Sequence, residues 1–198
     1  TVYLFSINHT AIMKRLFLYF TLFLFLPLKS YSQTGKVFDN LSLTSKILKS
    51  ERKFAIYLPP DYDSSQRSYP VLYLLHGAGD DQTGWVQFGE VLHLTDKSIK
   101  DGEATPMIIV MPDAKTGQMG YFNDIKGQWK YEDFFFNELI PYVEKTYRIK
   151  SEKRYRAVAG LSMGGGGSFM YALHHPEMFS SACPLSAYVG PLSVEELK

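Results

Sequence analysis

The chain has 198 residues, of which 45% are hydrophobic and 15% aromatic, and its formal net charge is +1. This composition is typical of one globular domain of ordinary size, and the near-neutral charge gives no electrostatic reason to expect a nucleic-acid partner. The single cysteine, Cys183, excludes an intramolecular disulfide. The apolar residues around it predict a small, buried side chain.

The N-terminal region has the pattern of an export signal. Lys14 and Arg15 precede an apolar stretch of 13 residues, Leu16 to Leu28. This stretch is too short to cross a bilayer core about 30 Å thick, and the small residue Ser32 precedes a suitable cleavage point. A signal peptide is therefore expected, with a membrane anchor as the alternative.

The predicted domain organisation follows from this cleavage point. We expect residues 1–12 to come from upstream translation, 13–32 to be the signal peptide and 33–198 to be the mature domain, secreted or periplasmic. The mature segment keeps 18 basic and 20 acidic residues, a net charge of −2. No stable membrane span is expected after cleavage.

The order of the predicted elements favours an α/β fold with a mostly parallel sheet and helices on both faces. Alternating or continuous apolar runs predict strands, and apolar residues at helical spacing predict helices. Pro141 should bend the second helix because it removes a hydrogen bond. The strands are expected at 37–49, 52–58, 71–75, 106–111, 156–159 and 179–185, the last buried, and the helices at 91–101, 131–147 and 163–174.

Ser162 lies in Gly160-Leu161-Ser162-Met163-Gly164, a G-x-S-x-G pattern between a predicted strand and a predicted helix. A sharp strand-to-helix turn exposes the serine hydroxyl and leaves no room for side chains at the two glycines. The N–H of Met163 then points at a developing oxyanion, helped by the helix N-terminus. A phosphate-binding loop would need a lysine that this sequence lacks.

A second amide donor is expected after the strand at 71–75, where the sequence reads His76-Gly77-Ala78. Gly77 permits a tight turn, and the N–H of Ala78 is the candidate donor. In acyl-transfer enzymes one such donor contributes about 2.7–4 kcal/mol to the stabilisation of the transition state.

The sequence resembles the esterase D and feruloyl-esterase branch of the α/β-hydrolases. The matching segments are YLLHGAGDDQTGW, PMIIVMPDA, FFFNELIPYVEKTYRI, AVAGLSMGGG and FSSACPLSA. The resemblance implies an α/β-hydrolase fold that lacks its last strand–helix units. It also implies that Ser162 is the nucleophile of a carboxylic-ester hydrolase, with Ala78 and Met163 in the oxyanion hole. Exported members of this branch often act on feruloyl or acetyl esters of polysaccharides.

The acid and the histidine of the catalytic triad are not found after the serine. His174 and His175 lie about 18 Å along the helix from Ser162, beyond the reach of a general base, and are expected near the last helical carbonyls. His76 is out of triad order, and His93 is expected on the surface of a helix. We therefore expect a C-terminally truncated chain that is inactive by itself.

Candidate substrate contacts lie in the long loop 113–130 and beside it. They are Tyr121, Trp129 and Glu132, together with His76, although the aromatic residues could equally serve to cover the sheet. No cofactor or metal is expected. The alternatives to hydrolysis are acyl transfer of the mycolyltransferase type and a non-catalytic carbohydrate-binding module on a hydrolase fold.

Overall fold

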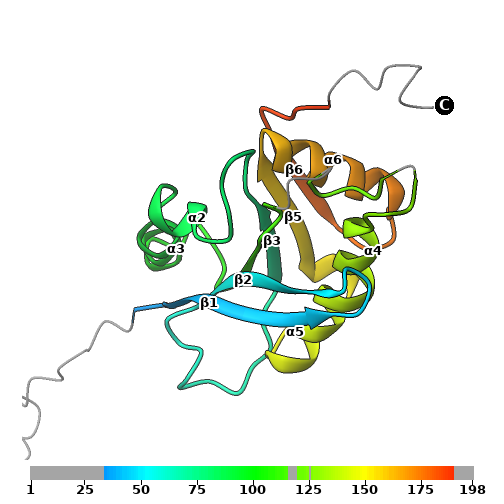
Figure 1. Ribbon diagram of the computed structural model, residues 1–198. Coiled ribbons are helices and arrows are strands. Elements are labelled where there is room, and N and C mark those ends of the chain that lie inside the picture. The colour runs from blue at the N-terminus through cyan, green and yellow to red at the C-terminus, as the bar shows by residue number, and fades with distance from the viewer. Residues whose placement is uncertain (1–33, 116–119, 125, 190–198) are drawn as a thin grey trace, which may run out of the picture. The chain divides into compact units, whose positions relative to one another are not determined.

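The computed structural model describes residues 34–115, 120–124 and 126–189. Its centre is a six-stranded sheet with the order β1-β2-β4-β3-β5-β6 (Figure 1). The predicted upstream segment and signal peptide lie outside the described residues, among which no helix is long and apolar enough to cross a membrane. The strands are β1 (Lys36–Ser45), β2 (Ser50–Leu58), β3 (Val71–Leu75), β4 (Ile108–Pro112), β5 (Arg156–Leu161) and β6 (Ser181–Leu185).

Strand direction decides where the functional residues gather. β1, β2 and β4 pair antiparallel, whereas β4, β3, β5 and β6 run parallel. Tyr73 in β3 is in register with Val110 in β4 and Val158 in β5. The carboxyl ends of these strands therefore meet at one edge of the sheet, where ligand sites of open α/β sheets are found.

Helices cover both faces of the sheet, as the sequence predicted. The longer run of helices packs on one face with Phe54, Tyr73 and Val158, while α3 contributes Val91 to a smaller core on the other face (Figure 1). The helices are α2 (Gly84–Gln87), α3 (Val91–Lys100), α4 (Tyr131–Phe134), α5 (Ile140–Thr146) and α6 (Met163–His174), with a 3₁₀ turn at Lys153–Tyr155.

The helical region predicted at 131–147 is divided by a π-helical segment. Phe135–Leu139 forms π turns between α4 and α5 and ends two residues before Pro141. A proline in a helix lacks an N–H and its ring crowds the preceding turn. Wider turns relieve such crowding, so the irregularity that Pro141 predicted takes the form of a π segment.

The last strand differs from its prediction. All five residues of β6 are exposed, and Cys183 is exposed rather than buried. β6 lies at the end of the sheet and pairs with β5 alone among the strands described. An apolar run can predict a strand, but whether that strand is covered depends on what packs against it.

A buried ion pair connects the start of β5 to α5. The Arg156 guanidinium donates to Glu144 Oε1 at 2.6 and 2.9 Å, and their side chains are 6% and 14% exposed. Arg156 also donates to the carbonyls of Ser151 and Met178. The pair therefore connects a strand, a helix and two loops.

Removing one partner of this pair should destabilise the fold. In Glu144→Gln a guanidinium remains buried without its carboxylate, which typically costs about 3–5 kcal/mol. The free energy of unfolding, measured by urea titration, is expected to fall by that order. Glu152→Gln, which breaks the exposed pair with Arg154, serves as the control and should leave it nearly unchanged. Equal effects of the two substitutions would contradict a structural role for the buried pair.

Candidate active site

Ser162 stands at a sharp bend between β5 and α6. Its φ is +54° and its ψ is −110°, a conformation that costs free energy for a residue with a side chain. The bend is held on both sides: its N–H donates to the carbonyl of Leu185, and its carbonyl accepts from the N–H groups of Gly166 and Tyr188, each at 2.9 Å. Ser162 remains partly exposed.

Close backbone approaches explain the glycines that flank the serine. A Cβ on Gly160 would lie 2.3 Å from the carbonyl oxygen of Gly164, and one on Gly164 would lie 2.4 Å from that of Leu75. A side chain on Gly160 would therefore push α6 away from β5, and one on Gly164 would push it away from β3. The next three glycines, Gly165 to Gly167, would likewise meet the chain after β6 or the ring of Tyr121.

The loop after β3 lies beside the serine. A Cβ on Gly77 would be 3.8 Å from the Cβ of Ser162, and Ala78, the next residue, is exposed. Met163 is the first residue of α6, so its N–H has no acceptor within the helix. The two amides named from the sequence therefore belong to segments that flank Ser162.

His76 is buried beneath this loop, with 2% of its surface exposed. Its Nε2 accepts the N–H of Ala114 at 2.9 Å, so the proton lies on Nδ1, which donates to the carbonyl of Gly77 at 2.8 Å. Both ring nitrogens are thus occupied. The sequence-based assignment of His76 as a substrate contact is wrong, because the ring supports the loop from inside.

Asp113 extends the support around His76, and the sequence analysis did not single it out. The Arg52 guanidinium donates to the carboxylate and to the main-chain carbonyl of Asp113, each at 2.9 Å. The Tyr131 hydroxyl donates to the same carbonyl at 2.8 Å. An aspartate directly after a buried strand, as in PMIIVMPD, is the signal that could have identified this residue.

Tyr121 belongs to the core rather than to a cleft, which corrects its assignment as a substrate contact. Its side chain is fully buried, and its hydroxyl donates to the carbonyl of His76 at 3.1 Å. The Tyr171 hydroxyl, on α6, donates to the carbonyl of Tyr121 at 2.6 Å. Burial raises the pKa of both phenols well above their usual value, so both stay neutral donors.

Glu132 is occupied by two histidines instead of facing a substrate. Its Oε1 lies 2.9 Å from His174 Nδ1 and 2.9 Å from His175 Nε2. The prediction that these histidines bind the last helical carbonyls is therefore wrong, because both rings are bound to a carboxylate on α4. Trp129 is half-buried against the core, and the Arg52 guanidinium lies 5.8 Å from its ring centre.

None of the four histidines that the structure describes is placed as a general base for Ser162. His76 is buried with both nitrogens bonded, His174 and His175 bind Glu132, and His93 is exposed on α3. Within the described ranges, no group of three or more His, Cys, Asp or Glu side chains is arranged to hold a metal ion.

Comparison with known proteins places this arrangement in a family. Residues 45–194 match the family model Esterase, described as "Putative esterase". The chain is 38% identical over 152 residues to an endo-1,4-beta-xylanase/feruloyl esterase of Xylanibacter ruminicola, covering 72% of this chain and 20% of that protein. It is 39% identical over 143 residues to the esterase Rv1288 of Mycobacterium tuberculosis, covering 70% of this chain and 29% of that protein.

Solved structures give the same result. A ferulic acid esterase superimposes with a TM-score of 0.74 and 41% identity, covering 78% of this chain and 59% of that one. The ferulic acid esterase of Anaeromyces mucronatus, solved with ferulic acid, gives 0.66 and 27%, covering 79% and 59%. The chain thus spans about three fifths of these structures and less than a third of the two curated relatives. It belongs to the esterase family of the α/β-hydrolase fold, among its feruloyl-esterase-like members.

Proposed function

We propose that the chain carries the nucleophile and the oxyanion hole of a serine ester hydrolase that works through an acyl-enzyme. The observation that carries this proposal is the conformation of Ser162, whose positive φ is held by three backbone hydrogen bonds at a glycine-lined bend. Strained backbone at the end of a parallel strand is a recurrent property of catalytic positions. The esterase relatives support the same reaction class.

The proposed reaction uses the two amides beside the serine. Ser162 Oγ attacks the ester carbonyl carbon, and the N–H groups of Ala78 and Met163 stabilise the negative oxygen of the tetrahedral intermediate. The carbon–oxygen bond to the alcohol breaks, and the alcohol leaves with the proton taken from the serine. Water then adds to the acyl-serine, releasing the acid and restoring the hydroxyl.

The general base is proposed to lie outside the described residues. A base must approach the hydroxyl within about 3 Å, and the four described histidines are occupied elsewhere or exposed on α3. The 198-residue chain by itself should therefore hydrolyse esters slowly. A complete natural protein that supplies a histidine to this site should be fast.

The proposed substrates are feruloyl or acetyl esters of polysaccharides. The names of the relatives support this class, since they include an endo-1,4-beta-xylanase/feruloyl esterase and ferulic acid esterases. The basic and apolar pattern at residues 13–32 supports action outside the cytoplasm, in the periplasm or medium. Acyl transfer is the second candidate, favoured by 28% identity over 141 residues to the diacylglycerol acyltransferase/mycolyltransferase Ag85A of Mycobacterium gordonae.

Replacing the serine should abolish covalent chemistry. In the complete natural protein, Ser162→Ala is expected to remove labelling by a fluorophosphonate and to lower kcat for methyl ferulate by about 10⁵–10⁶-fold. Ser168→Ala removes a buried hydroxyl from α6, the helix that follows Ser162. It is the control and should keep activity. In the 198-residue chain, p-nitrophenyl acetate hydrolysis should barely change on Ser162→Ala. A large drop there would contradict the proposal, drawn from the described residues, that this chain supplies no general base.

The loop His76-Gly77-Ala78, here called the oxyanion loop, carries one of the two proposed amide donors. Removing its support should lower kcat more than it raises KM. In the complete protein, His76→Ala frees the carbonyl of Gly77 and the N–H of Ala114, so the Ala78 amide loses its fixed position. A misplaced donor typically costs about 10²–10³-fold in kcat. Steady-state kinetics with methyl ferulate test this.

Two further variants separate positioning from general damage. His93→Ala, at an exposed position of α3, should keep full activity. His76→Asn keeps a donor near Nδ1 and should recover part of kcat at an unchanged melting temperature. If His76→Ala kept wild-type kcat, the positioning role would be disproved.

Hydrolysis and transfer are separated by adding an acceptor alcohol. A hydrolase yields mainly free ferulate from methyl ferulate in water with added glycerol, because water competes for the acyl-serine. Product analysis by chromatography is expected to show ferulate as the main product. Glyceryl ferulate in excess would favour the transferase instead.

A further inference from the structure

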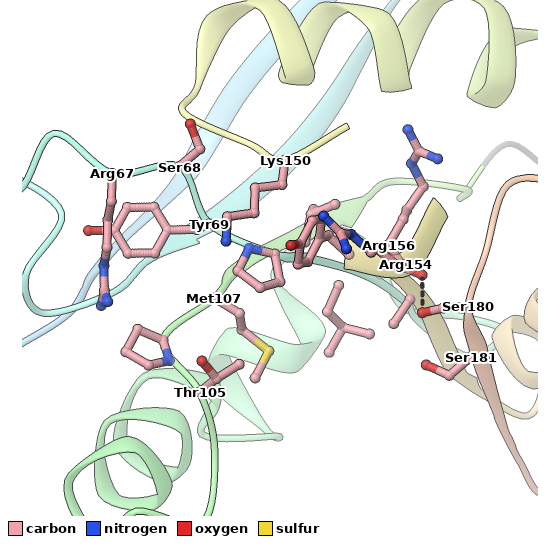
Figure 2. A pocket seen from close by; sticks show the side chains of 16 residues that line it. Arg67, Ser68, Tyr69, Thr105, Met107, Lys150, Arg154, Arg156, Ser180 and Ser181 are labelled. Carbon is pink, nitrogen blue, oxygen red and sulfur yellow. Dashed lines mark hydrogen bonds between the residues drawn. The ribbon is translucent and has the colours of Figure 1, made fainter. Parts of the chain in front are cut away.

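A second candidate site lies at the opposite end of the sheet from Ser162. A cavity of about 680 Å³ opens at the amino ends of the parallel strands, where it is bordered by Val71, Met107, Arg156 and Ser181 (Figure 2). Its volume falls within the range of small-molecule sites, about 300–1,000 Å³. Ser162 follows the carboxyl end of β5, so the cavity and the candidate active site are separated by the length of the strand.

Three cationic side chains border this cavity, and each lies over an aromatic ring. The Arg67 guanidinium lies 4.9 Å from the ring centre of Tyr69. Lys150 Nζ and the Arg154 guanidinium lie 4.4 and 4.6 Å from the ring centre of Tyr155. Figure 2 shows Lys150 extending across the middle of this group. Two positive charges on one ring repel each other, and a bound anion would relieve that repulsion.

The positive charge at the cavity is incompletely neutralised. Arg67 pairs with Asp61 and Arg154 with Glu152, whereas no described carboxylate forms an ion pair with Lys150. None of the described lining residues is an aspartate or a glutamate. Arg156 is excluded as a ligand-binding cation because its pair with Glu144 is buried, whereas the pair of Arg154 with Glu152 is exposed and can open to a ligand.

The remaining lining suits an organic anion rather than a bare ion. Ser68, Thr105 and Ser181 supply exposed hydroxyl groups, which can donate to an oxyanion or to a sugar hydroxyl. Pro70, Pro106, Met107 and Leu72 supply apolar wall. Pockets with apolar walls and a few placed polar groups hold ligands with a carbon body.

We propose that this cavity binds the carboxylate or phosphate group of a small organic anion with a sugar-sized body, and that Lys150 and Arg154 provide the main contacts. The proposal does not depend on the ester-hydrolase function, because it involves none of the residues around Ser162. Carboxylate and phosphate share the oxyanion that these cations and hydroxyls recognise.

Three probes that differ at one position of the same ring test the proposal. Glucose, glucuronate and glucose 6-phosphate are titrated separately into ¹⁵N-labelled protein, and amide shifts are followed by NMR. We expect saturable shifts with the two anions at residues 67–69, 71–72, 105, 107, 150–157 and 180–181, and none with glucose. The anion that binds more tightly shows whether the site prefers a carboxylate or a phosphate group. The Ala78 and Met163 amides should not move, which separates this site from the active site.

Charge-removing variants and salt sharpen the test. Lys150→Gln should weaken anion binding at least fivefold, and Lys150→Gln with Arg154→Gln should abolish it. Lys153→Gln, an exposed position that does not line the cavity, is the matched control and should bind normally. Raising the salt to about 1 M, where the Debye length is about 3 Å, should weaken binding further.

Several results would overturn the proposal. The first is the absence of saturable shifts with both anions, and the second is equal binding by wild type and Lys150→Gln. The third is equal binding of inorganic phosphate and glucose 6-phosphate, which would show that the sugar-sized body contributes nothing to binding. Because the chain spans part of its structural relatives, the titration is repeated with the complete natural protein. Loss of binding there would also reject the cavity as a native site.

Discussion

The structure depends on one close contact, the approach of α6 to the strands on either side of Ser162. The first turn of the helix begins where backbone atoms of β3 and of the chain after β6 leave no space for a Cβ. That contact fixes the bend, and the bend fixes the serine at a positive φ. The strained backbone of Ser162 costs free energy, and three backbone hydrogen bonds at that residue offset the cost.

The oxyanion loop is held by a different device, a buried chain of hydrogen bonds. Arg52 on β2 binds Asp113, which follows β4, and the N–H of the next residue, Ala114, binds His76. Tyr121 then connects His76 to Tyr171 on the helix of the serine. Both ring nitrogens of His76 and both phenol hydroxyls have partners in this chain, whereas Arg52 Nε has none among the described residues. The nucleophile and the loop beside it are thus connected through the interior as well as at the surface.

Sequence patterns were sufficient for the parts of the fold that depend on local rules. Apolar runs located β3 and β4, helical spacing located α3, and Met163–His174 is the helix that was expected. The G-x-S-x-G pattern located the bend because its glycines have no substitute there. Local rules failed to predict side-chain contacts between residues that are far apart in the sequence. Tyr121 enters the core, Glu132 binds two histidines, and His76 faces inwards.

The exposure of β6 has a consequence beyond the site. Leu185 is 43% exposed, and the strand forms one edge of the described sheet. The outer peptide groups of this strand are open to pairing with another strand, except at Pro184, which has no N–H to donate. A strand that paired with β6 would therefore find one donor fewer than a regular edge offers, which limits how long a ladder can form there.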